Sequence, residues 1–172
     1  GLIIDDRANG GGNVSPMILE RLSREPYRLT MRRGSARIGT VPDAVQVGPK
    51  VCLINKYSAS DGDLFPWGFR ALGLGKLIGT RTWGGIVGIS GSLPYMDGTD
   101  IRVPFFTSFD PKTGNWIIEN QGVDPDILID NDPVKEWNGE DQQLDRAIQE
   151  VMKELQNRKP LPGVPTPRDF SK

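Results

Sequence analysis

Two stretches of this chain each run from a short apolar segment through a tight turn into a helix, and this repeated order limits the possible folds most. The first starts at residues 2–4 and passes the glycines 10–12 to a helix with Ser15 as N-cap and Pro16 at its first position. The second starts at residues 50–55. Buried strands that alternate with helices predict an α/β fold with a substantially parallel sheet.

The helix of the second stretch follows the segment YSASDGD. Its apolar side chains have the spacing of one helix face and are Phe65, Phe69 and Leu72. We expect Gly73 to end this helix. Because proline is comfortable only in the first turn, Pro66 predicts a helix that begins near Asp63 and leaves the amides around residues 60–62 free.

The remaining segments predict one domain and a tail. Alternating polar residues indicate a hairpin or an ordered excursion between Arg28 and Gly48. Further short apolar runs lie at 76–79, 101–106 and 116–119. A closing helix with one apolar face ends before Pro160, with Asn138 and Asp141 as its cap. We therefore expect a single domain over residues 1–159 and an extended or disordered tail over residues 160–172.

Composition excludes several classes of function. A net charge of -1 gives no electrostatic attraction to nucleic acid or to an anionic membrane. No apolar stretch reaches the roughly 18 residues that cross a bilayer. The chain has no histidine, the commonest general base and metal ligand, and its single cysteine, Cys52, is predicted to be a buried small side chain. Gly1 leads at once into an apolar run without an initiating Met, so we expect a fragment of a larger chain.

Ser60 is the strongest candidate for chemistry. It follows a buried strand and precedes a helix, so its hydroxyl can project from a tight turn toward free N–H groups and the positive end of the helix dipole. This geometry suits a serine nucleophile, because such donors stabilise the negative charge that develops on a carbonyl oxygen. The alternative is that Ser60 only caps the helix.

The glycine run offers a second donor for the same oxygen. If the glycine loop lies beside the Ser60 turn, an amide of Gly11 or Gly12 can reach the substrate without an obstructing side chain. A structural turn without a ligand is the alternative. A phosphate loop is disfavoured, because NGGGNVS has neither GxGxxG nor GxxxxGK[ST] spacing.

Other charged and aromatic residues give weaker signals. Asp61 and Asp63 complete no loop pattern for a hard cation, and complementarity to the helix dipole explains them better than a metal site. Trp67 and Trp83 either line the cleft or pack in the core. Four arginines could line a substrate path for acidic peptides or chain termini, but a solvated hairpin explains them better. They are Arg28, Arg32, Arg33 and Arg37.

Four ordered motifs resemble the catalytic core of the tricorn proteases, the histidine-using branch of the C-terminal processing peptidase family. They are LIIDDRANGGGNVS, INKYSASDGDLF, GLGKLIGTRTWGG and IIENQGVDPDI, and they span residues 2 to 129. The resemblance implies a crotonase-like spiral of ββα units. It also implies that residues 1–159 are the C-terminal, nucleophile-bearing domain of a serine peptidase that works through an acyl-enzyme and needs no metal or cofactor.

The resemblance assigns roles to individual residues. Ser60 matches the nucleophile, and the backbone amide of Asp61 matches one oxyanion donor. The last glycines of NGGG match the other donor, with Gly12 preferred over Gly11. Glu119 matches the acidic residue that orients the catalytic histidine through an intervening serine. From its local sequence alone, Glu119 is read instead as a strand-end salt bridge.

One departure from the wider family concerns the base. Relatives with a Ser–Lys dyad carry a lysine where this chain has Gly85, and Lys76 lies before a separate strand. The base is therefore expected to be a histidine on an upstream segment that precedes a PDZ-like module, so this chain alone should be inactive. The resemblance also implies peptide substrates and a homo-oligomer. It leaves the location open between the cytoplasm, as in archaeal relatives, and export, as in many bacterial forms, and of the two we expect an exported bacterial protein. The alternatives are a non-catalytic peptide- or ligand-binding module and another serine hydrolase, such as an esterase or amidase.

Overall fold

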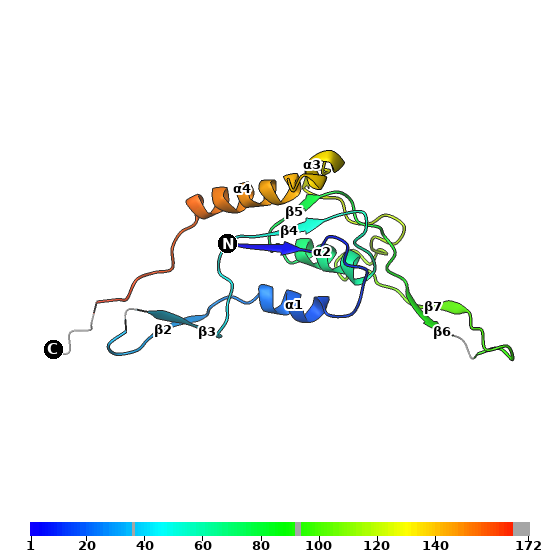
Figure 1. The fold of residues 1–172 in the computed structure, drawn as a ribbon. Helices are drawn as coiled ribbons and strands as arrows, with labels where there is room; N and C mark the ends of the chain where they lie inside the picture. Colours follow the sequence, from blue (N-terminus) through cyan, green and yellow to red (C-terminus); the bar gives the residue numbers. More distant parts are fainter. Residues whose placement is uncertain (36, 92–93, 167–172) are drawn as a thin grey trace.

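A parallel β-sheet forms the centre of the molecule (Figure 1). The computed structural model describes residues 1–35, 37–91 and 94–166. Within them, the sheet has the order β1 (Leu2–Asp5), β4 (Lys50–Ile54), β5 (Lys76–Gly79) and β8 (Ile127–Leu128). All of its neighbouring strands run parallel. The predicted α/β fold with a parallel sheet is confirmed.

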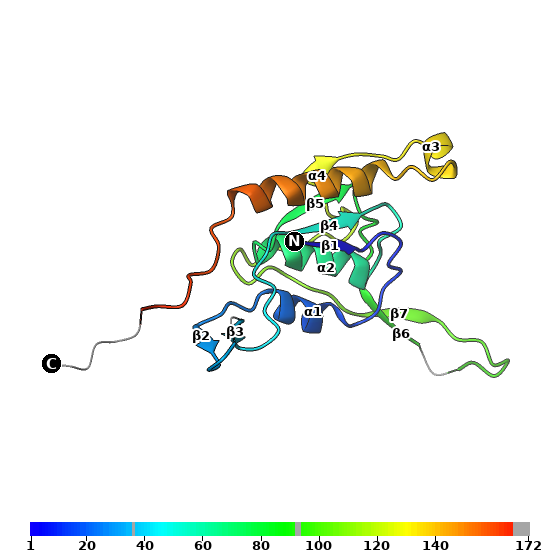
Figure 2. The same cartoon turned by 60° about the vertical axis from the view of Figure 1, so that its left-hand side comes forward.

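Helices cover both faces of this sheet (Figure 2). Helices α1 (Ser15–Leu22) and α2 (Asp61–Ala71) lie on one face, and α4 (Gln142–Asn157) lies on the other. The buried side chains of β4 alternate between the two layers, since strand side chains point to opposite faces in turn. Cys52 and Ile54 pack with α1 and α2, whereas Val51 and Leu53 pack with α4. Cys52 is fully buried, as predicted.

Two antiparallel hairpins extend from opposite ends of this body (Figure 1). Strands β2 (Arg28–Met31) and β3 (Ile38–Val41) form the predicted first hairpin. Strands β6 (Gly88–Gly91) and β7 (Arg102–Phe106) form the second, of which only β7 was expected. The apolar run at 116–119 makes only an isolated bridge, between Trp116 and Phe109.

The C-terminal part contains elements that its acidic sequence did not indicate. Asn138 is the C-cap of the short helix α3 (Pro133–Trp137), and Asp141 alone caps α4, by accepting a hydrogen bond of 3.0 Å from the Leu144 amide. Of the predicted tail, residues 160–166 form neither helix nor strand, and residues 167–172 lie outside the described part. None of the helices described is both long and apolar enough to cross a membrane.

The start of α2 corrects a prediction. The helix begins at Asp61, two residues before the predicted start, so Pro66 lies in its second turn. Its first turn is closed by bonds of the Asp63 and Leu64 amides to the Ser60 carbonyl oxygen, at 2.9 and 3.0 Å. The missing N–H of Pro66 would have bonded four residues back, to Gly62, and the helix tolerates this loss.

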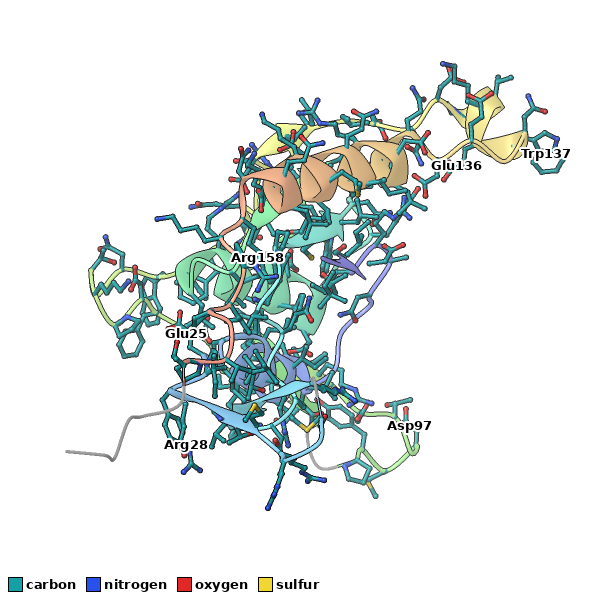
Figure 3. All side chains as sticks on the ribbon, turned by 90° about the vertical axis from the view of Figure 1, so that its left-hand side faces the viewer. Glu25, Arg28, Asp97, Glu136, Trp137 and Arg158 are labelled. Atoms are coloured by element: carbon teal, nitrogen blue, oxygen red, sulfur yellow. The ribbon has the colours of Figure 1, made fainter. Side chains whose placement is uncertain are left out.

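We expect Phe69→Ala to lower the free energy of unfolding by about 3–5 kcal/mol, because this large side chain is fully buried between α2 and the sheet. The matched control is Trp137→Ala, since Trp137 is 90% exposed and projects outward from α3 (Figure 3). Its effect should stay within about 0.5 kcal/mol. Denaturant unfolding measures both changes, and equal losses would contradict this description of the core.

Candidate active site

The backbone of Ser60 is strained. Ser60 is the N-cap of α2 and has φ 57° and ψ −114°, in a region that residues with a side chain rarely adopt. Such a conformation costs about 1–3 kcal/mol and persists only where the surroundings impose it. Both the nucleophile and the helix-cap interpretations of Ser60 place it at this position, and the strain distinguishes it from an ordinary cap.

Asp63 holds this strained turn in place. It is completely buried, and its Oδ2 accepts hydrogen bonds from the amides of Ser60, at 2.9 Å, and Gly85, at 3.1 Å. Its Oδ1 accepts one from Gly84, at 2.7 Å. The Ser60 amide also lies 3.1 Å from the carbonyl oxygen of Gly85. Asp63 therefore does more than complement the helix dipole, because it ties the turn to the following glycine pair.

Asp61 joins the same turn to α1. Its Oδ2 accepts hydrogen bonds of 3.0 Å from the amides of Val14 and Ser15, and its Oδ1 accepts one from the Ser15 hydroxyl. Ser15 is therefore not the side-chain cap that the sequence predicted. Asp61 satisfies the first amides of α1 from another helix, and α1 starts at Ser15 itself.

These bonds leave no obvious place for a cation. The carboxylate oxygens of Asp61 and Asp63 already accept hydrogen bonds from N–H and O–H donors. Within the ranges that the structure describes, no group of three or more His, Cys, Asp or Glu side chains could hold a metal ion.

The amides at the start of α2 are less free than predicted. Gly62 donates to the carbonyl oxygen of Ala59, at 2.8 Å, and Ser60 has the two acceptors given above. The Asp61 amide has no acceptor among the described residues. Of the amides of residues 60–62, which were predicted to be free, only that of Asp61 lacks an acceptor among the described residues. It lies at the positive end of the helix dipole.

The glycine loop lies directly against Ser60. Gly11 has φ +123°, and a Cβ added to it would be 2.9 Å from Ser60 Cβ and 3.2 Å from Ser60 Oγ. Only glycine leaves this space open. The Gly11 amide donates to Asn9 Oδ1, at 3.1 Å, whereas the Gly12 amide has no acceptor in the part of the chain that is described. Gly12 faces Asp61, whose Oδ2 would lie 4.0 Å from an added Cβ.

Asn9 fastens this loop to the Ser60 turn. Its carbonyl oxygen accepts a hydrogen bond of 2.8 Å from the Ala59 amide, and a Cβ at Gly62 would overlap the same oxygen. Its side-chain Nδ2 donates to Asp6 Oδ1, at 2.9 Å. The two strand-to-helix turns of the sequence thus meet in space.

Asp6 is an unusual acid in this network. It is 6% exposed, and its Oδ2 has no hydrogen-bond partner in the described structure. Burial raises the pKa of Asp6 to about 7; the hydrogen bond from Asn9 opposes this rise, and repulsion from Asp61 adds to it. Asp6 is therefore largely a neutral carboxylic acid at mildly acidic pH.

Glu119 binds the backbone that directly follows the glycine pair. Its Oε2 accepts hydrogen bonds from the amides of Ile86, at 2.7 Å, and Val87, at 2.9 Å. The Ile86 N–H belongs to the same peptide group as the Gly85 carbonyl that accepts from Ser60. Glu119 lies in a turn, and among the described residues it forms no ion pair, so the strand-end salt bridge was the wrong alternative.

The comparisons place this arrangement in a family. The sequence pattern described as "Peptidase family S41" matches residues 1–129. The chain belongs to peptidase family S41. The tricorn protease of Thermoplasma volcanium is 44% identical over 162 residues, which are 92% of this chain and 15% of that protein. The S41 resemblance to tricorn proteases predicted from the four motifs is thus confirmed.

Solved structures agree with this S41 assignment. A crystal structure of the tricorn protease superimposes with a TM-score of 0.83 at 42% identity, and covers 91% of this chain and 15% of that one. A photosystem II D1 C-terminal processing protease superimposes with a TM-score of 0.56 at 25% identity, over 76% of this chain and 34% of that one. The chain therefore spans about a seventh of the length of the tricorn relatives it matches.

Lys76 is not positioned as a base in this S41 chain. It lies at the amino end of β5, whereas Ser60 follows the carboxyl end of the neighbouring β4. Its Nζ lies 2.6 Å from a carboxylate oxygen of Glu150, and this hydrogen bond raises the pKa of Lys76. Lys76 thus keeps its proton and lies at the other end of the sheet.

The structure also separates the two interpretations of the tryptophans. Trp67 packs against the buried cluster between α2 and the sheet. Trp83 is 67% exposed, and its ring fills the space that a side chain at Gly85 would need. Trp83 therefore lies at the surface beside the glycine pair that bonds to Ser60.

The four arginines belong to the β2–β3 region, where they are exposed, as the solvated-hairpin interpretation predicted. This hairpin lies at the opposite end of the molecule from the β6–β7 hairpin, whose first strand follows the glycine pair (Figure 1). Within one copy of the chain, these arginines do not line the Ser60 site.

Sequence reasoning missed the supporting residues Asp6 and Asn9 and understated Asp63. Asp63 did carry a signal, because an acid three residues after a serine has the spacing of a capping box. Asp6 and Asn9 carried none, since their roles come from contacts with a turn about 50 residues away.

We expect Asp6→Asn to become more stabilising as the pH rises. Below the ordinary Asp value of 3.8, Asp6 is protonated in the folded and unfolded chains alike. Between pH 3.8 and about pH 7, the unfolded chain loses this proton while the folded chain keeps it. The free energy of unfolding of the wild type therefore falls by up to about 1.4 kcal/mol per pH unit, and that of Asp6→Asn does not. Denaturant unfolding at several pH values measures the difference.

The control for this titration is Asp5→Asn. The hydrogen bond from Arg7 lowers the pKa of Asp5, so this substitution should cost stability above pH 4, the opposite sign. A difference between wild type and Asp6→Asn that does not change with pH would contradict the assignment.

Proposed function

We propose that this chain is the nucleophile- and oxyanion-hole-bearing part of a serine peptidase, with Ser60 as the nucleophile. The observation that carries the proposal is the strained Ser60 turn at the start of α2, with Gly11 packed against the Ser60 side chain. The amides of Asp61 and Gly12 have no acceptor in the described structure. Membership of peptidase family S41 supports it. Peptides are the proposed substrates.

The reaction follows from the chemistry of serine. Ser60 Oγ attacks the carbonyl carbon of the peptide bond while a base takes its proton, and the carbonyl oxygen becomes negatively charged. The base then gives the proton to the departing amine, and the C–N bond breaks to leave an ester on Ser60. Water, deprotonated by the same base, hydrolyses this ester and regenerates the hydroxyl. No metal or cofactor takes part in these steps.

The negative oxygen is proposed to bind the amides of Asp61 and Gly12. Both lack an acceptor in the described part of the chain, whereas the Gly11 amide is bonded to Asn9. This supports Gly12 over Gly11 as the second donor. The role of Gly11 is then to leave room for the substrate beside Ser60. Loss of one such donor costs roughly 3–4 kcal/mol of transition-state stabilisation.

Glu119 is proposed to orient the base. Its Oε2 is fixed by two amides, and its Oε1 has no hydrogen bond among the described residues, so Oε1 can accept one from an incoming group. The base would be a histidine on an upstream segment of the full-length protein, aligned through a serine and followed by a PDZ-like module.

The proposal includes the crotonase-like spiral as the complete fold, a homo-oligomeric assembly and negligible turnover by the 172-residue chain alone.

Labelling of the full-length protein with a fluorophosphonate tests the proposal. We expect covalent modification of Ser60, mapped by mass spectrometry, and its loss in Ser60→Ala. A folded protein that stays unlabelled would refute an activated nucleophile and favour a peptide-binding module. Peptide turnover by the isolated chain that disappears in Ser60→Ala would refute the need for an upstream base.

Two glycine substitutions test the space beside Ser60. We expect Gly11→Ala to lower kcat/KM for a peptide substrate at least tenfold, because the new methyl group would press on Ser60 Cβ and Oγ. Gly10→Ala is the matched control, since a Cβ there meets nothing within 4 Å, and it should leave kcat/KM within about twofold. Melting temperatures separate this local effect from unfolding, and equal kinetics would argue against the proposed geometry.

A further inference from the structure

The proposed mechanism gives no role to Asp6, although this acid is buried beside the site. Its backbone is fixed on both sides: its amide donates to the Leu53 carbonyl oxygen at 2.9 Å, and its carbonyl oxygen accepts from the Ser58 hydroxyl at 2.8 Å. Its Oδ2 nevertheless has no partner in the described structure. An unpaired buried carboxyl oxygen is costly, so its retention calls for an explanation.

A continuous chain of hydrogen bonds leads from Asp6 to both sides of the proposed oxyanion site. Asp6 Oδ1 accepts from Asn9 Nδ2, and Asn9 Oδ1 accepts from the Gly11 amide, at 2.9 and 3.1 Å. The Asn9 carbonyl oxygen accepts from Ala59, next to Ser60. Asn9 therefore spaces the glycine loop from the Ser60 turn, and Asp6 fixes the orientation of the Asn9 side chain.

We propose that Asp6 is a positioning residue that acts through Asn9 to hold the glycine loop at the correct distance from Ser60. This inference rests on the proposed function of Ser60. It adds that the geometry of the oxyanion site depends on the protonation state of a side chain that never touches the substrate.

The surroundings of Asp6 favour the neutral form. The titratable groups that face it are Asp5 on β1, Cys52 on β4, and Asp61 and Asp63 on α2. None of them is a cation, and no ion pair to Asp6 is formed among the described residues. A charge on Asp6 would be repelled by its neighbours and poorly solvated.

Ionisation of Asp6 therefore has a structural consequence. The charged Oδ2 needs a donor, and the site can supply one only if the carboxylate turns or the loop opens to admit water. The bond from Asn9 favours the charged form, so the Asn9 side chain follows the carboxylate and shifts from its position between the two turns. The glycine loop then loses the constraint on its distance from Ser60, and kcat falls as the pH rises through the titration of Asp6.

Kinetics of the full-length protein test this role. We expect Asp6→Ala to lower kcat for a peptide at least tenfold at pH 6.5 with little change in KM. Asp6→Asn mimics the neutral acid and keeps the acceptor for Asn9, so its kcat should stay within threefold of wild type at pH 6.5. Between pH 7 and 9, wild type should lose at least threefold in kcat relative to Asp6→Asn.

Asp5→Asn is the control for charge alone. It removes the same charge one residue away, on a side chain that is paired with Arg7 and makes no bond to the glycine loop, so it should keep the wild-type pH profile. An Asp6→Asn profile identical to that of wild type would overturn the proposal. An Asp6→Ala variant with wild-type kcat would also overturn the proposal. If Asp6→Ala does not fold, the pH profile of Asp6→Asn decides the question.

Hydrogen exchange gives a readout that does not need catalysis. At pH 8, the amides of residues 8–14 should exchange at least threefold faster in wild type than in Asp6→Asn, measured by mass spectrometry of the full-length protein. Equal exchange would overturn the proposal. If the wild type shows neither labelling nor turnover but this difference is present, the proposed function fails while the role of Asp6 in the loop stands.

Discussion

The site depends on one buried carboxylate, that of Asp63, which holds Ser60 in a backbone conformation that serine would not otherwise adopt. The donors that bind this carboxylate come from the turn itself and from the Gly84–Gly85 segment. Because a buried carboxylate without donors would be very costly, the acid and the two loops stabilise one another. The strain at Ser60 is thus balanced by the coordination of Asp63.

Asp61 extends the same principle in the opposite direction. It lies two residues before Asp63 and binds the first amides of α1, so successive acids of α2 attach to different parts of the chain. One helix start therefore organises both neighbouring loops. The arrangement leaves the Asp61 amide unpaired in the described structure, although the side chain of the same residue is fully used.

The sequence predicted the parts of this structure that depend on local pattern. Apolar runs located the parallel strands β1, β4 and β5 and both helices beside Ser60, and the glycine run predicted a close backbone approach, which Gly11 makes. Local rules failed where distant partners decide. Asp61 caps α1 in place of Ser15, and Pro66 lies inside α2 instead of in its first turn. Strand β8 pairs with β5, although its flanking sequence is acidic and was predicted to be surface. Glu119 was predicted through family resemblance and not from its local sequence, because its partners are amides 32 and 33 residues away.

The peptide group between Gly85 and Ile86 connects the two residues proposed to act on opposite sides of the reaction. Its carbonyl accepts from Ser60 and its N–H donates to Glu119. A peptide group is planar and resists twisting, so it is a rigid connection between the Ser60 amide and the Glu119 carboxylate. While both hydrogen bonds are kept, the Ser60 amide and the Glu119 carboxylate cannot change their separation without moving this peptide group. Any displacement of one must tilt this plane and be passed to the other, which makes the spacing of the two groups a property of the backbone.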